Sequence, residues 1–331
     1  MRRLERIPFG LTLLAAALLL SVATVAIQVD SLGMHFIRVK QEQAHQEMLA
    51  GNSDSPWQYR ILADLVIEPV IRLFRKVQLP TPAANTFIAV RFLQAVFVLC
   101  MAGLFYRRLG LPLAANLLGL SVLTWGMGLS HYNSDLSFSI FFDVAFYLLA
   151  GLLIVERRYM WIPLLMVPAA LNRETSLLIP VMLAAYAYTQ IRPAVNPRPA
   201  YRAAAASIAI FAAIFIGLRL YYGPRPYLTA DRYYPGPALM LVNLSRWATW
   251  QQLLVTLGIL PILAALSYAH WPPPLRVFAW SVVPIWIVVH FAAALVAETQ
   301  LMLVPHALIF IPGALFGLMA GTQAIAEPGA S

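Results

Sequence analysis

Charged residues and cysteines are scarce in this chain. Asp, Glu, Lys and Arg make up 11% of its 331 residues, against about 25% in an average soluble domain. Because a water-soluble fold needs a polar surface, so little charge beside 61% hydrophobic residues and a mean hydropathy of +0.73 excludes a soluble enzyme, a disordered protein and a nucleic-acid-binding domain. The single cysteine, Cys100, lies in an apolar run and excludes an intramolecular disulfide framework and a cysteine-rich metal site.

Several catalytic signatures are missing from the sequence as well. It has no His-Glu-x-x-His motif and no histidine cluster with metal-ligand spacing, so we predict no metal site. It has no glycine-rich phosphate loop and no Gly-x-Ser-x-Gly turn, so neither an ATP-driven protein nor a serine hydrolase is indicated. We therefore expect a function that requires no cofactor.

Long apolar segments are what the chain has instead. A bilayer core about 30 Å thick is crossed by roughly 20 apolar residues in a helix. Most apolar segments of this sequence have that length, and they lie at 7–29, 86–106, 111–130, 136–155, 159–171, 175–191, 203–222, 251–269, 277–297 and 301–320. The sequence therefore predicts an all-α, polytopic transmembrane helix bundle of about ten spans, forming one domain over 1–320, with a short tail at 321–331.

Two of these segments, 159–171 and 175–191, are short and flank the polar sequence Leu171-Asn172-Arg173-Glu174. They form either one long helix or two short helices that meet at a polar break. A break at membrane depth is tolerated only where protein or a water-filled cavity covers it. The first segment is longer than the apolar region of a typical signal peptide, so we interpret it as an uncleaved first span.

The positions of the basic residues predict the orientation. Short cytoplasmic loops are enriched in Lys and Arg, and a cytoplasmic N-terminus and C-terminus place most of the arginines inside. The inner set is Arg2, Arg3, Arg6, Arg107, Arg108, Arg157, Arg158, Arg192, Arg198, Arg202 and Arg276, against Arg173, Arg225, Arg232 and Arg246 in the short outer loops. The net charge of +9 is thus explained by topology and by attraction to the anionic lipid of the bilayer, not by a nucleic-acid partner.

The first outer loop, 30–84, is predicted to carry juxtamembrane helices. Residues 39–49 are typical of a polar helix outside the membrane, and 61–77 of an amphipathic helix lying in the interface, which Glu68-Pro69 would interrupt or kink. A second outer loop, 222–250, is rich in proline and aromatic residues, which favours a stiff segment at headgroup level.

Polar residues gather at the outer helix ends in four short clusters. An ionisable group at membrane depth costs several kcal/mol unless it is paired or hydrated, which makes it a functional candidate. The clusters are Asp54-Ser55-Pro56-Trp57-Gln58-Tyr59-Arg60, His131-Tyr132-Asn133-Ser134-Asp135, Asn172-Arg173-Glu174-Thr175 and Glu298-Thr299-Gln300. We expect them to converge on one chamber beneath the outer surface.

Each cluster also has a purely structural interpretation. Arg173 and Glu174 could form an ion pair that caps two short helices, and His131 and Tyr132 could be interfacial anchors. Asp135 could cap the following helix, and Asp54 could simply form a turn. Within the spans, Arg91 and Arg219 could pair with Asp143 or reach towards the interface.

The chain resembles the GT-C class of membrane glycosyltransferases, and in particular bacterial members with two short motifs. These are Tyr59-Arg60-Ile61-Leu62 in the first outer loop and Asn172-Arg173-Glu174-Thr175 in mid-chain, and polar positions at 135–149 and 298–300 also agree. The class normally carries an acidic residue, often an acidic pair, soon after its first span. Here Asp30 is followed by Ser31 and no Asp-Glu or Asp-Asp pair occurs, which leaves the catalytic base open.

The resemblance implies transfer of a sugar from a polyprenyl-phosphate donor to an acceptor at the periplasmic face of a bacterial inner membrane. Arg60 or Arg173 would bind the donor phosphate, because a guanidinium can hold two of its oxygens. A carboxylate, Asp54 or Asp30, would take the acceptor's proton. The substrate-binding set implied in this way is Tyr59, Arg60, His131, Tyr132, Asp135, Asn172, Arg173, Glu174 and Glu298, with Trp57 as a further stacking residue.

Two other functions remain open from the sequence. The short pair 159–171 and 175–191 is similar to the discontinuous helices of transporters, which favours a carrier of lipids or small solutes. The missing acidic pair favours a non-catalytic, GT-C-like scaffold subunit.

Overall fold

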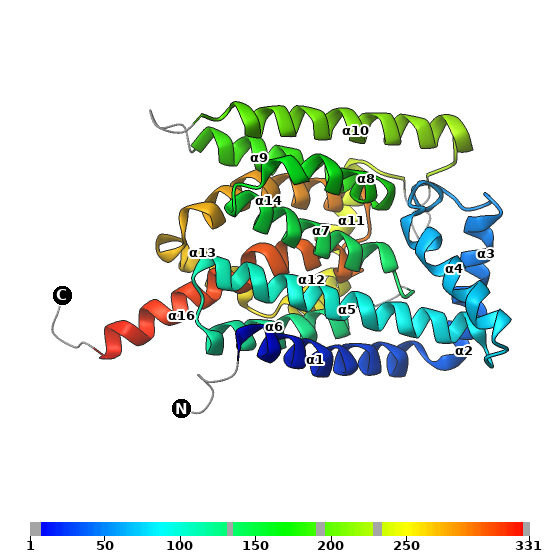
Figure 1. The fold of residues 1–331 in the computed structure, drawn as a ribbon, viewed down its shortest axis with the longest axis horizontal. Helices are drawn as coiled ribbons and strands as arrows, with labels where there is room; N and C mark the ends of the chain where they lie inside the picture. Colours follow the sequence, from blue (N-terminus) through cyan, green and yellow to red (C-terminus); the bar gives the residue numbers. More distant parts are fainter. Residues whose placement is uncertain (1–7, 131–134, 190–195, 228–233, 327–331) are drawn as a thin grey trace.

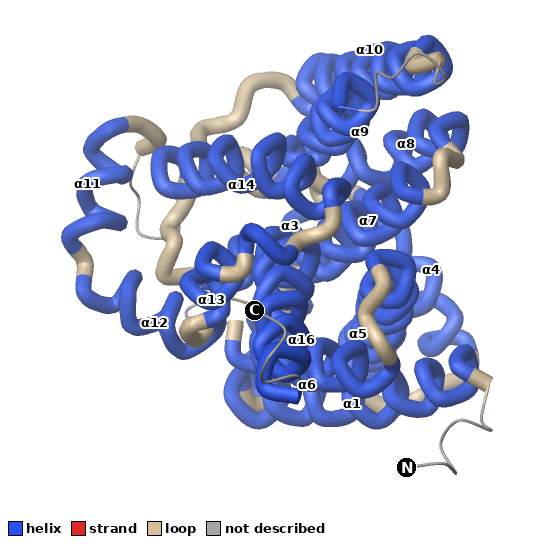
Figure 2. Tube along the Cα trace, turned by 90° about the vertical axis from the view of Figure 1, so that its left-hand side faces the viewer, coloured by secondary structure: helices blue, strands red, loops and turns tan. Residues whose placement is uncertain are grey.

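The computed structural model describes residues 8–130, 135–189, 196–227 and 234–326, and over these ranges the regular secondary structure is helical (Figures 1 and 2). The predicted all-α class is confirmed for this part of the chain. The longer helices are α1 (Phe9–Leu32), α4 (Leu62–Lys76), α5 (Pro82–Leu109), α6 (Leu113–Leu129), α7 (Phe138–Val155), α8 (Ile162–Asn172), α9 (Leu178–Thr189), α10 (Arg198–Tyr222), α12 (Trp247–Leu257), α14 (Pro273–Ala293) and α16 (Ile311–Ala326).

Six helical segments of the described chain are long and apolar enough to cross a membrane. They are α1, α5, α7, α10, α14 and the segment Thr299–Thr322, in which α15 (Leu303–Pro305), a π-helical turn (His306–Phe310) and most of α16 follow one another. A seventh is formed if α12 and α13 (Leu260–Leu266), which meet at a 70° bend, count as one span. Because α6, α8 and α9 are shorter, the count of about ten spans stays a prediction.

The break between α8 and α9 falls at the predicted polar sequence. α8 ends at Asn172, Arg173 has extended backbone, and a 3-10 turn (Glu174–Leu177) leads into α9. Both helices pack against α10, and the view along the bundle shows them at separate positions (Figure 2). Of the two arrangements that the sequence left open, the structure therefore has two short helices.

Burial distinguishes the centre of the bundle from its periphery. The apolar window of Thr299–Thr322 is 78% buried, whereas that of α10 is 22% buried and that of α1 28%. α10 lies along one edge of the bundle and α1 along the opposite edge (Figure 1). Apolar side chains on such outer helices, Leu19 and Leu220 among them, are left exposed, as expected for helices that face lipid.

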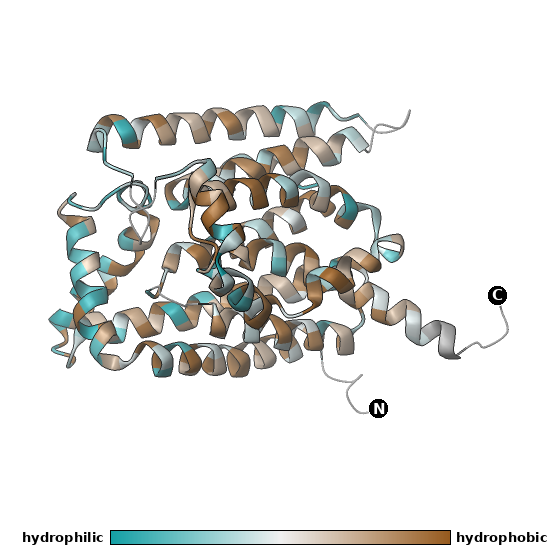
Figure 3. Ribbon diagram, turned by 180° about the vertical axis from the view of Figure 1, so that it is seen from behind, coloured by the Kyte–Doolittle hydropathy of each residue, from teal (hydrophilic) through white to brown (hydrophobic). Residues whose placement is uncertain are grey.

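The first outer loop folds into a cap at the end of the bundle away from the N- and C-termini (Figure 1). It contains α2 (Met34–Phe36), a π-helical turn (Ile37–Gln41), α3 (Glu42–Leu49), a 3-10 turn (Trp57–Tyr59) and α4. Hydrophilic residues are concentrated in this cap (Figure 3). α4 buries Ala63, Ile67 and Ile71 on one face, in line with its predicted amphipathic pattern, and it continues through Pro69 where we expected an interruption.

The second outer loop has more structure than the sequence suggested. A helix, α11 (Pro237–Ser245), lies within the predicted loop 222–250, and α12 already begins at Trp247. Asn243 ties α11 to the end of α14, because its Nδ2 donates to the carbonyl oxygens of Phe291 and Ala294 at 2.8 and 2.7 Å. The proline and aromatic content of this loop had obscured its short helical pattern.

Candidate functional site

A polar chamber opens beneath the cap formed by the first outer loop. Its main cavity, about 420 Å³, is lined by α3, α4, the turn after α3 and the residues that lead into α7. A smaller annex of about 60 Å³ reaches towards the α8–α9 break and the end of α14. The two spaces share the side chains of Trp57, Arg60, Ser137 and Glu298, so we treat them as one chamber.

The structure brings together most of the charged residues selected from the sequence. Asp54, Arg60, Asp135 and Glu298 line the main cavity. Arg173 lines the annex, again with Arg60 and Glu298. These residues come from four separate stretches of the chain, which is the convergence that the sequence predicted.

The turn that carries Trp57 and Arg60 is held in place by the second outer loop. The backbone N–H of Ser55 donates to the carbonyl oxygen of Pro226 at 3.0 Å, and the Tyr59 hydroxyl donates to that of Gly223 at 2.8 Å. Tyr227, whose hydroxyl donates to the carbonyl oxygen of Ala293 at 2.6 Å, connects this second loop to the end of α14. The position of Arg60 thus depends on contacts with segments far away in sequence.

Arg60 is fixed by Glu174 across the chamber wall. Its Nε and Nη2 both donate to Oε2 of Glu174, at 3.1 and 3.0 Å. The other carboxylate oxygen of Glu174 lies 3.6 Å from Nη2 of Arg219 on α10. Glu174 therefore shares its charge between one arginine in the chamber and one outside it.

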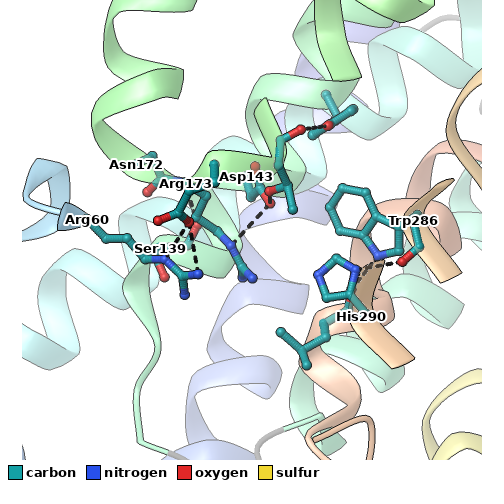
Figure 4. A network of polar contacts seen from close by, with 11 residues as sticks. Arg60, Ser139, Asp143, Asn172, Arg173, Trp286 and His290 are labelled. Carbon is teal, nitrogen blue, oxygen red and sulfur yellow. Dashed lines mark hydrogen bonds and ion pairs between the residues drawn. The ribbon is translucent and has the colours of Figure 1, made fainter. Parts of the chain in front are cut away.

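Arg173 is almost completely buried and incompletely neutralised (Figure 4). Its Nε lies 3.7 Å from Oδ2 of Asp143 on α7, which is too long for a hydrogen bond. Oδ2 instead accepts a hydrogen bond from the Thr175 hydroxyl at 3.0 Å. Nε and Nη1 of Arg173 have no hydrogen-bond partner among the described residues. A buried guanidinium with unsatisfied N–H groups, lining a cavity, is suited to an anionic ligand.

Asn172 has a supporting position at the same break. Its Nδ2 donates to the carbonyl oxygen of Ser139 at 2.8 Å, which joins the end of α8 to the first turn of α7 (Figure 4).

Asp143 pairs with Arg173, whereas Arg91 stacks on the rings of Phe138 and Phe141, with its Cζ 4.9 and 4.0 Å from their centroids. The suggested pairing of Arg91 with Asp143 is therefore wrong.

Carboxylates dominate the cap side of the chamber. The acidic side chains that line the main cavity are Glu47, Asp54, Asp64, Asp135 and Glu298. Gln41 holds Asp135 in place, since its Nε2 donates to Oδ2 of Asp135 at 3.4 Å and its Oε1 accepts from the backbone N–H of Leu136 at 2.9 Å. Asp54 is exposed, so its carboxylate can accept a proton from a molecule that enters the chamber.

His45 is a member of the chamber that our sequence interpretation missed. Its Nδ1 lies 2.6 Å from Oδ1 of Asp64, and its Nε2 lies 3.1 Å from Oε2 of Glu68. Burial lowers the pKa of His45, but the hydrogen bonds and charges of Asp64 and Glu68 outweigh it and raise the pKa above its usual 6.5. The signal that could have revealed this site is the spacing of Asp64 and Glu68, which puts two carboxylates on one face of a helix.

Other predicted site residues lie elsewhere. Asp30 is exposed near the end of α1 and does not line the chamber. Tyr59 lines a separate groove beside α10, and Glu174 lies behind Arg60. His131 and Tyr132 lie outside the described residues.

The described residues contain no group of three or more His, Cys, Asp or Glu side chains that could hold a metal ion. No family model matches the chain, and no curated protein and no solved structure matches it. What the structure defines is thus a class: an all-helical protein with several apolar helices long enough to cross a membrane and a charged chamber under a polar cap at one end.

Proposed function

We propose that this protein is a GT-C-like glycosyltransferase of a bacterial inner membrane, with its N-terminus in the cytoplasm. It would move a sugar from a polyprenyl-phosphate donor to an acceptor at the outer face. The observation that supports this proposal is the joint position of Arg60 and Arg173 in the annex, next to a cavity that Asp54 lines.

The two arginines are suited to the donor phosphate. The annex, at about 60 Å³, has room for a few water molecules or for a group of the size of one phosphate. Arg60 already has a carboxylate partner, whereas two nitrogen atoms of Arg173, Nε and Nη1, have no hydrogen-bond partner among the described residues. Phosphate oxygens would satisfy these donors and compensate the buried charge.

Asp54 is suited to the role of base. In the transfer step, the bond from the sugar's anomeric carbon to the phosphate oxygen breaks, and a bond from that carbon to the acceptor oxygen forms. The acceptor's proton passes to the Asp54 carboxylate, and the lipid-linked phosphate leaves with the electron pair of the broken bond. Arg60 and Arg173 would stabilise the negative charge that develops on it.

The remaining polar residues of the chamber would position the sugar. Asp135 and Glu298 line the main cavity and can accept hydrogen bonds from hydroxyl groups. Trp57 lines both parts of the chamber and offers a flat apolar surface for a sugar ring. Glu174 acts through Arg60, which makes it a positioning residue.

A direct test uses the purified protein in lipid bilayers with radiolabelled polyprenyl-phosphate sugars and a mixture of lipid acceptors. We expect label transfer by the native protein and a loss of about 100-fold or more in Arg60→Ala and in Arg173→Gln. Arg38→Ala is the matched control, because Arg38 is an exposed arginine of the same outer loop that does not line the chamber. Absence of transfer by the native protein, or equal transfer in all variants, would remove the proposal.

The broken pair α8–α9 also supports a second candidate, a transporter for lipids or small solutes. In a carrier, a cysteine in place of Asp54 would react with a thiol reagent added on either side of the membrane, and bound ligand would change which side reacts. Cys100 is the chain's single cysteine, so a Cys100→Ser background isolates the new thiol. Labelling from the outer side alone favours the transferase.

A further inference from the structure

A second cavity lies on the outer side of the bundle, between the first outer loop and α10. It is a groove of about 490 Å³ lined by Ser55, Tyr59, Ile216, Arg219, Leu220 and residues 223–225. None of these side chains lines the chamber. The groove is therefore a separate site, and the transferase proposal makes no use of it.

Two arginines give the groove its charge. The guanidinium of Arg219 is stacked between aromatic rings, with its Cζ 4.5 Å from the centroid of Tyr59 and 3.4 Å from that of Phe215. Arg225 has a buried Nε without a hydrogen-bond partner among the described residues. Among the described residues, no acidic side chain lines the groove. Both arginines can therefore donate hydrogen bonds to an anion placed between them.

The flank of the groove is apolar and faces outward. On α10, Ile216 and Leu220 lie one turn apart and are 54% and 80% exposed, which leaves an apolar strip beside the two arginines, and the neighbouring Tyr221 is 81% exposed. This end of α10 lies next to the polar cap, at the end of the bundle away from the termini (Figure 1). Arginine and tyrosine at the end of a lipid-facing helix are typical of the headgroup level of a bilayer.

We propose that this groove binds the phosphate of an anionic phospholipid, with the acyl chains along the exposed strip of α10. The apolar strip favours a lipid over free phosphate, because burying it against acyl chains adds to the charge interaction. The paired arginines favour an anionic headgroup over a zwitterionic one, whose own cation would lie close to them.

Glu174 connects this groove with the chamber. Arg219 and Arg60 share its carboxylate, at 3.6 and 3.0 Å. A lipid phosphate on Arg219 would compete with Glu174, so that Glu174 interacts more strongly with Arg60. Bound lipid would thereby stabilise Arg60 in the chamber, which is a coupling between two distinct sites.

Native mass spectrometry of the full-length protein in a neutral detergent tests the proposal. The probes are dioleoyl phosphatidylglycerol and dioleoyl phosphatidylcholine, titrated separately. We expect phosphatidylglycerol to bind about tenfold more tightly than phosphatidylcholine, and the preference to disappear in the Arg219→Gln/Arg225→Gln double variant. Arg202→Gln, an exposed arginine at the other end of α10, should keep it.

Single variants and competing anions complete this binding experiment. If Arg219→Gln fails to fold because Glu174 loses a partner, Arg225→Gln alone should still weaken phosphatidylglycerol binding several-fold. An unchanged preference in Arg225→Gln and in the double variant overturns the proposal. Displacement of the lipid by millimolar inorganic phosphate also overturns the proposal, because it indicates a simple anion site. Displacement by polyprenyl phosphate at a lower concentration than phosphatidylglycerol overturns it as well, because it assigns the groove to the sugar donor. Because binding is measured without sugar transfer, failure of the transferase assay leaves this result standing.

Discussion

Arg60 and Glu174 are 114 positions apart in the chain, yet Nε and Nη2 of Arg60 both donate to one carboxylate oxygen of Glu174, at 3.1 and 3.0 Å. The pair joins the cap to the break between α8 and α9. Their side chains are only 17% and 27% exposed, so solvent screens the interaction less than it would at the surface. This ion pair therefore connects two distant segments that both border the chamber.

A double-mutant cycle on this pair should give a measurable coupling. We expect Arg60→Ala and Glu174→Ala each to lower thermal stability, and the double variant to lose less than the sum, with a coupling of about 1–2 kcal/mol. The pair Arg75–Glu42, at 3.9 Å and with side chains 47% and 38% exposed, is the control and should couple by less than about 0.5 kcal/mol. Equal coupling in both pairs would mean that the chamber pair is no better shielded than a surface contact.

Exchange of the two candidate bases should separate them. Asp54→Asn should reduce sugar transfer by about 100-fold or more, because the amide cannot take the acceptor's proton. Asp30→Asn should leave transfer unchanged, because Asp30 lies on α1 outside the chamber. The measurement is the rate of label transfer at saturating donor.

The control is the unfolding temperature of each variant. Asp54→Asn and Asp30→Asn should both unfold at the native temperature, because both side chains are exposed. Loss of transfer in Asp30→Asn together with full activity in Asp54→Asn would reverse the assignment.

The stability of the cap should depend on pH through His45. Its folded-state pKa lies above 6.5, so its contribution is fully present below pH 6.5 and is lost as pH rises through the folded-state value. A neutral imidazole can donate to only one of Asp64 and Glu68, which leaves the other carboxylate without its donor. The unfolding temperature of the native protein should therefore fall by a few degrees as pH rises from 6.5 through the folded-state pKa, and this fall should be absent in His45→Gln.

Glu68 sets the lower limit of the same pH range. Burial raises its pKa, but hydrogen bonds from Arg72, at 2.8 Å, and from His45 outweigh that effect and lower the pKa below its usual 4.5. Its contribution is present above pH 4.5 and is lost as pH falls through the lowered value. The cap should thus be most stable between these two limits. A native protein whose unfolding temperature does not change as pH rises above 6.5 would contradict the role of His45.

The broad architecture could be read from the sequence because its signals are strong and local. Apolar runs predicted the long helices, and the amphipathic pattern of 61–77 predicted α4. The break at 172–174 was visible because an Asn-Arg-Glu sequence stands between two apolar segments. That Arg60, Arg173 and Glu298 line connected cavities agrees with the simple expectation that outer helix ends lie near one another.

Pairings between side chains could not be predicted in the same way. The sequence offered Arg91 or Arg219 as a partner for Asp143, whereas the structure pairs Asp143 with Arg173 and Arg219 with Glu174. His45 was hidden because its partners lie on another helix, and α11 because a nine-residue helix has too few turns for a clear period. Distances across the bundle depend on packing, which a local pattern does not contain.

Close packing at Gly313 provides a last test, independent of function. A Cβ on Gly313 would lie 2.5 Å from Cζ2 and 2.7 Å from Cε2 of Trp271, whose Nε1 donates to the Gly313 carbonyl oxygen at 3.1 Å. The indole is buried and held by this bond, so Gly313→Ala should destabilise the protein by about 1–3 kcal/mol, measured by thermal unfolding in detergent. Gly217→Ala on α10 has nothing within 4 Å of the added Cβ and should be neutral, or stabilising by up to about 1 kcal/mol through helix propensity. If both variants unfold at the native temperature, α16 does not pack against Trp271 as the structure shows, and the arrangement of the central helix would have to be revised.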